Sequence, residues 1–133
     1  MSRFITSIDH VNLRAPRDMM HKLKAFYCNV LGLLEGPREG FTSYGFWLYC
    51  GEQAVVHLSE YRGEGVPLTH VTTTFDHVSF SCADADVMET QLKAHQIDYS
   101  IRIIERLAIK QFNFKDPAGN GVELSCPLAP VQP

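Results

Sequence analysis

The stretch Phe75-Asp76-His77-Val78-Ser79-Phe80 nearly repeats an earlier one, Ile8-Asp9-His10-Val11-Asn12-Leu13. In each copy an Asp-His-Val core follows an apolar residue and precedes an alternation of polar and apolar residues. The two histidines are 67 positions apart (77 minus 10) in a chain of 133 residues, which is half its length. This spacing predicts that the chain consists of two similar halves.

The first half is predicted to fold as βαβββ. Residues 4–14 alternate as in a strand, and apolar residues then recur at helical spacing over 19–31, with Asp18 as the expected N-cap and Gly32 as the stop. Turn residues separate three further β segments, at 33–38, 44–50 and 54–59. Residues 61–73 show no periodicity and are predicted to be a linker.

The second half is predicted to repeat this order. A strand begins at Thr74, a helix opens at residues 83–86, and three more strands follow at 99–104, 108–115 and 121–125. The fold class is therefore α+β. We expect one domain over residues 1–133, with a first module at about 4–60 and a second at about 74–126.

The last strand of each half also corresponds. Val56-His57-Leu58-Ser59 matches Val122-Glu123-Leu124-Ser125, so His10 corresponds to His77 and His57 to Glu123. Because side chains alternate across a strand, one face of each half is expected to pack on its helix and the other to be polar. The predicted polar face carries His10, Asn12, His57, Ser59, His77, Ser79, Glu123 and Ser125.

His10, His77 and Glu123 are predicted to be metal ligands. Two imidazoles and one carboxylate suit a divalent first-row metal with open positions for water or substrate. Calcium and magnesium sites, in contrast, prefer oxygen ligands. Whether His57 is a further ligand is left open by the repeat, which pairs it with Glu123. The remaining histidines are expected at the surface: His21, His70 and His95.

Composition excludes several functions. A net charge of −3, a pI of about 6.0 and the lack of a dense basic cluster argue against binding to nucleic acid or an anionic membrane. No apolar run approaches the roughly 18 residues of a membrane span, and no signal peptide is recognisable, so a cytoplasmic location is expected. The four cysteines form no C-x-x-C pair and are predicted to be free, buried thiols.

These motifs resemble those of the vicinal oxygen chelate superfamily, which includes glyoxalases, extradiol dioxygenases and bleomycin resistance proteins. The resemblance runs from Ile8 to Cys126 and includes the turn at residues 116–120 before Glu123. It implies paired βαβββ modules that form an open, U-shaped sheet around a metal, usually in a homodimer. It also implies a small-molecule substrate with vicinal oxygens.

The residue at position 57 distinguishes the branches of this superfamily. In lyases and epimerases the position resembles a fourth ligand, normally Glu or Gln, whereas in extradiol dioxygenases it is similar to a His that acts as acid and base without binding metal. The resemblance therefore favours a ring-cleaving dioxygenase with Fe(II) or Mn(II) and a catalytic His57. One alternative is a glyoxalase-like lyase, isomerase or epimerase with His57 as fourth ligand. A second is a non-catalytic drug-binding or resistance protein. Zn, Ni and Co are further metals that the resemblance allows.

One feature of the dioxygenases is missing. Their next-to-last strand carries a Tyr, whereas residues 108–115 offer only Gln111 and Asn113 on the predicted polar face. Tyr44 or Tyr49 could take its place. The residues that alternate with the polar pair, Phe112 and Phe114, are predicted to lie in the core.

Overall fold

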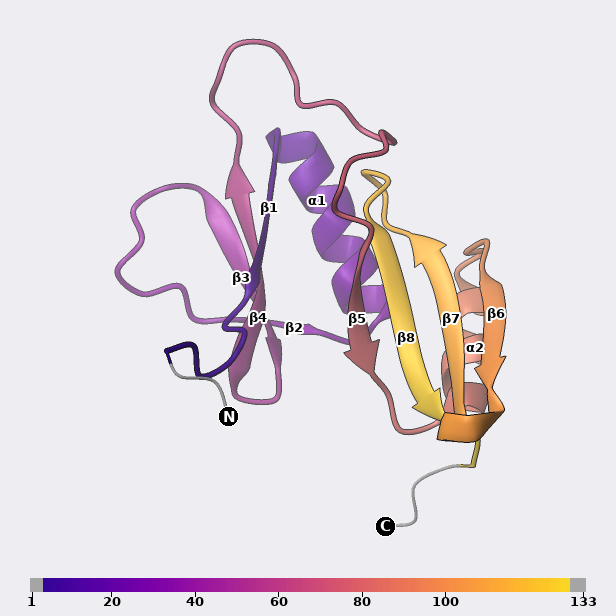
Figure 1. Ribbon diagram of the computed structural model, residues 1–133. Coiled ribbons are helices and arrows are strands. Elements are labelled where there is room, and N and C mark those ends of the chain that lie inside the picture. The colour runs from indigo at the N-terminus through magenta and orange to yellow at the C-terminus, as the bar shows by residue number, and fades with distance from the viewer. Residues whose placement is uncertain (1–3, 130–133) are drawn as a thin grey trace. The chain divides into compact units, whose positions relative to one another are not determined.

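The computed structural model describes residues 4–129 (Figure 1). The chain divides into two compact units, of which the first ends at Pro67 and the second begins at Leu68. The boundary falls inside the segment predicted to be a linker.

Unit 1 is a four-stranded mixed sheet with strand order β1-β4-β3-β2. β1 and β4 are parallel, and the other neighbours are antiparallel. The helix α1 packs against β1, β3 and β4 (Figure 1). The elements are β1 (Val11–Ala15), α1 (Arg17–Ala25), a π-helical turn η1 (Phe26–Val30), β2 (Leu34–Gly36), β3 (Gly45–Cys50) and β4 (Gln53–Glu60).

The helical segment of unit 1 begins earlier than predicted. Its N-cap is Pro16, whose carbonyl accepts a hydrogen bond from the Met20 amide at 2.9 Å, and Asp18 lies in the first turn. A proline fixes its own φ at a value suited to a helix start, and a carboxylate in the first turn interacts favourably with the helix dipole. The predicted end is confirmed, because Gly32 adopts a φ of 79°.

Unit 2 repeats this architecture with strand order β5-β8-β7-β6. β5 and β8 are parallel, and Glu89 of α2 pairs with Lys110 of β7 at 3.6 Å. The Asp84 carboxylate caps α2 by accepting hydrogen bonds from the amides of residues 86 and 87. The elements are β5 (His77–Ser81), α2 (Ala85–Ala94), β6 (Ser100–Ile104), a 3₁₀ turn η2 (Glu105–Leu107), β7 (Ile109–Lys115) and β8 (Gly121–Pro127).

The α+β class and the βαβββ order of both halves are thus confirmed. The strand register repeats as well: Asn12 lies opposite His57 in unit 1, and Ser79 lies opposite Glu123 in unit 2. The apolar neighbours of His57 and Glu123 are buried, as alternation predicts: Val56, Leu58, Val122 and Leu124. Phe112 and Phe114 are buried too, so the prediction that they lie in the core is confirmed.

The first strand of each unit is shorter than predicted. β1 begins at Val11 and β5 at His77, whereas the alternation in the sequence extends back to residues 4 and 74. Alternation reports which way side chains point in an extended segment, but a strand also needs a hydrogen-bonded neighbour. His10 and His77 consequently lie where the chain enters the parallel strand pair of each unit.

The prediction of four free, buried thiols is wrong. Cys82 and Cys126 form a disulfide with a Cα–Cα distance of 4.9 Å. The parallel pairing of β5 with β8 brings them together, since Ser81 lies opposite Ser125 one residue earlier. The two thiols outside this bridge are Cys28, which is half-buried, and Cys50, which is exposed.

None of the helices between residues 4 and 129 has the length and apolar character needed to cross a bilayer.

Candidate metal and substrate site

Both predicted site residues of unit 1 contact one tryptophan. Trp47 on β3 lies opposite His57 on β4, and their rings stack at 4.1 Å with an interplanar angle of 9°. The His10 ring meets Trp47 edge-on at 4.7 Å and lies 6.1 Å from the His57 ring. His10, Trp47 and His57 therefore form one cluster on the polar face of unit 1.

Each histidine of the repeated motif is oriented by the aspartate that precedes it. His10 Nδ1 lies 2.6 Å from Asp9 Oδ1, and His77 Nδ1 lies 2.7 Å from Asp76 Oδ2. A carboxylate can only accept, so Nδ1 carries a proton in both rings, and Nε2 is the nitrogen left to accept or to bind a metal when the ring is neutral. The hydrogen bond from His77 holds the pKa of Asp76 below its usual value. Metal-binding histidines commonly have this arrangement.

The two predicted site residues of unit 2 also lie together. His77 Nε2 is 3.6 Å from Glu123 Oε2, and the Glu123 side chain is 13% exposed. A cavity of about 640 Å³ in this unit is bordered by Asp76 and His77, with Tyr99 and Asn113 among its other lining residues. Of this pair, His77 thus borders space for a small molecule, with the Asp76 carboxylate next to it.

His57 is held by an arginine that the sequence did not single out. Arg38 Nη2 lies 3.3 Å from His57 Nε2, and because a guanidinium only donates, Nε2 must accept. Burial lowers the pKa of His57, and the charges of Arg38, His10 and Arg14 add to that effect. His57 is therefore a neutral imidazole whose Nε2 lone pair faces Arg38.

The structure pairs the predicted residues two by two, His10 with His57 and His77 with Glu123. Between residues 4 and 129, no cluster of three Cys, His, Asp or Glu side chains suited to a metal is found. The three-residue ligand set draws on both units and stays a prediction.

The other histidines lie at the surface, as predicted, and the hydroxyls of Tyr44 and Tyr49 form their contacts away from the cluster of His10, Trp47 and His57. His21, His70 and His95 are exposed. The Tyr49 hydroxyl donates to the Pro37 carbonyl at 2.8 Å, and the Tyr44 hydroxyl contacts His21 Nε2 at 2.9 Å.

Three residues of the unit 1 site were missed by sequence reasoning: Arg38, Phe41 and Trp47. Strand alternation could have found Trp47, because it occupies a position in residues 44–50 two places from Tyr49 and on the same face. Arg38 falls at the end of the predicted strand 33–38, but β2 ends at Gly36, so Arg38 and Phe41 lie in the loop between β2 and β3, where strand alternation does not place side chains.

Two βαβββ units, each bringing together two of the predicted site residues, are the architecture of a glyoxalase-type protein. The chain belongs to the Glyoxalase/Bleomycin resistance protein/Dioxygenase superfamily, whose model matches residues 7–124. Members of this superfamily are mostly enzymes that act on small molecules, typically with a divalent metal.

Individual relatives agree with this assignment. The chain is 31% identical to Glyoxylase I 4 of Arabidopsis thaliana over 136 aligned positions, which cover 97% of this chain and 76% of the relative. A glyoxalase family protein from Bacillus anthracis is 25% identical with a TM-score of 0.72, covering 96% of this chain and 99% of that one. A glyoxalase/dioxygenase from Nostoc punctiforme has the same fold, with a TM-score of 0.73 at 18% identity and coverage of 96% and 95%.

Proposed function

We propose that this protein is a metal-dependent enzyme that acts on a small substrate with vicinal oxygens, and that His10, His77 and Glu123 hold the metal. The observation that carries this proposal is the pair of Asp–His contacts, at 2.6 and 2.7 Å, which engage Nδ1 of both histidines and leave Nε2 as the nitrogen that can bind a metal. Two imidazoles and a carboxylate fit Fe(II) or Mn(II). When bound, such an ion acts as a Lewis acid that stabilises negative charge on the substrate oxygens.

His57 is proposed to be the catalytic acid and base. Its imidazole is neutral, which a base must be before it accepts a proton, and its Nε2 already lies in a hydrogen bond to Arg38. A histidine whose Nε2 accepts from a cation is poorly suited to bind a second cation through the same atom. This geometry favours the ring-cleaving dioxygenase, in which His57 takes a proton from a substrate hydroxyl.

A second candidate is a glyoxalase-like lyase, isomerase or epimerase in which His57 is a fourth ligand. It is favoured by the relative named Glyoxylase I 4, which aligns with 97% of the chain. In that case Arg38 must release His57 when the metal binds.

Metal analysis tests the proposal first. Protein purified without chelators should contain one divalent ion per site, and His10→Ala, His77→Ala and Glu123→Ala should each lose it. His21→Ala, a change at an exposed histidine of α1, is the matched control and should retain the metal. A metal-free protein that takes up no divalent ion when one is supplied would exclude both enzymatic candidates and leave the non-catalytic binding protein.

Oxygen uptake and one variant then separate the two enzymatic candidates. Consumption of oxygen with a panel of catechols under Fe(II) supports ring cleavage, and no consumption across the panel supports the lyase or isomerase. If His57 is an acid and base, His57→Ala keeps its metal while turnover falls roughly 10²- to 10⁴-fold. If His57 is a ligand, metal affinity falls as well.

The homodimer and the cytoplasmic location implied by the family are part of the same proposal. Sedimentation equilibrium of the purified protein tests the first, and fractionation of cells that express it tests the second.

A further inference from the structure

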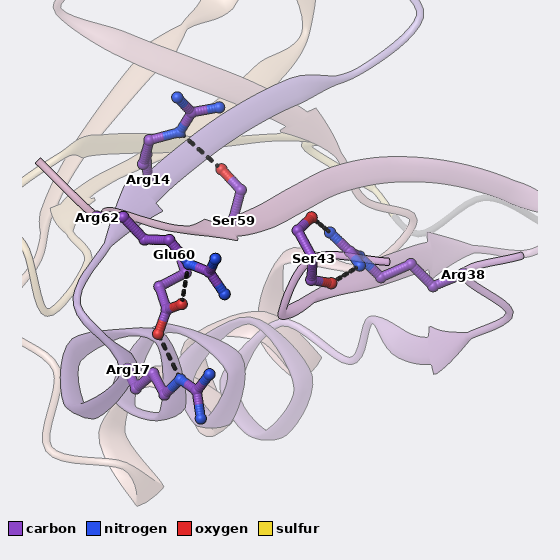
Figure 2. Close-up of polar contacts among 7 residues, drawn as sticks. All are labelled: Arg14, Arg17, Arg38, Ser43, Ser59, Glu60 and Arg62. Carbon is purple, nitrogen blue, oxygen red and sulfur yellow. Dashed lines mark hydrogen bonds and ion pairs between the residues drawn. The ribbon is translucent and has the colours of Figure 1, made fainter. Parts of the chain in front are cut away.

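The Arg38 guanidinium fills a space in unit 1 next to Phe41, Ser43 and Gly45. The side chain donates to the Ser43 carbonyl and, at 3.2 Å, to Ser43 Oγ (Figure 2). Its Cζ also lies 4.9 Å from the centre of the Phe41 ring. A Cβ at Gly45 would come within 2.6 Å of Arg38 Nη2, so the missing side chain at Gly45 leaves the room that the guanidinium fills.

Among residues 4–129, no carboxylate forms an ion pair with Arg38. Its described acceptors are the two oxygens of Ser43 and the nitrogen of His57, all of them neutral. Arg17 and Arg62, in contrast, share Glu60 (Figure 2). Arg38 Nε is buried and has no hydrogen-bond partner among residues 4–129. The Arg38 guanidinium thus has no charged partner among residues 4–129, and its buried Nε–H is unsatisfied there.

Aromatic rings line the space next to this charge. A cavity of about 250 Å³ in unit 1 is bordered by Arg38, Phe41, Trp47 and Tyr49, and the exposed Glu39 lines it as well. Aromatic side chains beside a cation suit a planar aromatic acid. The ring of such a ligand can stack on the aromatic side chains while its carboxylate accepts hydrogen bonds from the guanidinium.

We propose that Arg38 recognises a carboxylate on the substrate, and that Phe41 and Trp47 contact the planar part of the same molecule. The substrate class is a single-ring aromatic acid, and as a substrate assignment this rests on the function proposed above. A carboxylate accepts more strongly from a guanidinium than Ser43 or His57 does, since both partners are charged. The incoming acid therefore draws Arg38 Nη2 away from His57 and frees His57 Nε2 to meet the substrate.

Trp47 is the single tryptophan of the chain, so its fluorescence reports directly on this cavity. The probe is benzoate, compared with neutral benzamide, titrated into the metal-free protein with excitation where neither compound absorbs. The wild-type protein should bind benzoate more tightly than benzamide. Arg38→Met should weaken benzoate binding roughly 10- to 100-fold, the effect expected for loss of a hydrogen bond to a charged group, and should leave benzamide unchanged.

Two further variants keep the result interpretable. Arg38→Lys retains the charge but lacks the paired N–H donors of the guanidinium. This variant should bind benzoate several-fold more weakly than wild type while still preferring benzoate to benzamide. Arg106→Met, at an exposed arginine of η2, should behave as wild type. A thermal melt of each variant shows whether it is folded.

The inference is overturned if benzoate and benzamide bind equally, or if a folded Arg38→Met binds benzoate as wild type does. This result is independent of the metal analysis. If the protein binds benzoate through Arg38 but takes up no metal, the proposed function is overturned and the carboxylate site stands. If it binds the metal but not benzoate, the carboxylate site is overturned and the proposed function stands.

Discussion

Replacing Asp9 by Asn should weaken metal binding without disturbing the fold. Asp9 precedes β1, its side chain is 92% exposed, and its Oδ1 accepts from His10 Nδ1 at 2.6 Å. The substitution keeps the size of the side chain and removes the charge that orients His10. Carboxylates that orient a ligating histidine are typically worth 10- to 100-fold in metal affinity. Since water also competes for the Nδ1 proton at this exposed position, we expect the lower end, roughly tenfold.

Trp47 fluorescence provides the assay, because the His10 ring lies 4.7 Å from it and a paramagnetic ion such as Co²⁺ at His10 quenches it. Titration of the metal-free protein should give a dissociation constant about tenfold higher for Asp9→Asn than for wild type. Asp76→Asn should have a similar effect, since its contact with His77 is equivalent at 2.7 Å.

Glu52→Gln is the matched control, a carboxylate-to-amide change in the exposed turn between β3 and β4. It should bind metal as wild type does. The reasoning is refuted if Asp9→Asn retains wild-type affinity while His10→Ala loses the metal, because the aspartate would then have no part in presenting His10. An equal loss in Glu52→Gln would show that only net charge matters.

Three further predictions concern stability. Leu58 is fully buried, so Leu58→Ala should cost about 2–5 kcal/mol in urea denaturation, whereas Leu34→Ala, at a site 70% exposed, should cost under about 0.5 kcal/mol. The disulfide of Cys82 and Cys126 closes a loop of 44 residues, so its reduction should lower the free energy of unfolding by about 4 kcal/mol through the entropy of the unfolded chain. Cys50→Ser, at a free exposed thiol, is the control and should leave the free energy of unfolding unchanged. The hydrogen bond from Arg17, and then that from Arg62, lowers the pKa of Glu60, so the folded state holds this carboxylate ionised to lower pH than the unfolded state does. That stabilisation is present above the ordinary carboxyl pKa and is lost as pH falls through the folded value, so Glu60→Gln should lower the melting temperature at pH 7 and lower it less and less as the pH falls below the ordinary carboxyl range.

Much of the architecture follows from the sequence, because periodicity is a local property. The Asp-His-Val repeat and the alternation around residues 57 and 123 were enough to predict two βαβββ units and the face on which His57 and Glu123 lie. The boundaries were less well determined. The start of α1 depends on the backbone at Pro16 more than on a capping side chain, and the start of β1 depends on where pairing with β4 begins.

The chemical environment of the site was decided by tertiary structure. The stacking of Trp47 on His57 requires the register between β3 and β4, and the Cys82–Cys126 bridge requires the parallel pairing of β5 with β8. The contact between Arg38 and His57 joins residues 19 positions apart, and it depends on the path of the loop that follows the end of β2 at Gly36. A sequence pattern determines which way a side chain points along its own strand, whereas the partner it meets there depends on how separate segments pair and on which loop closes over them.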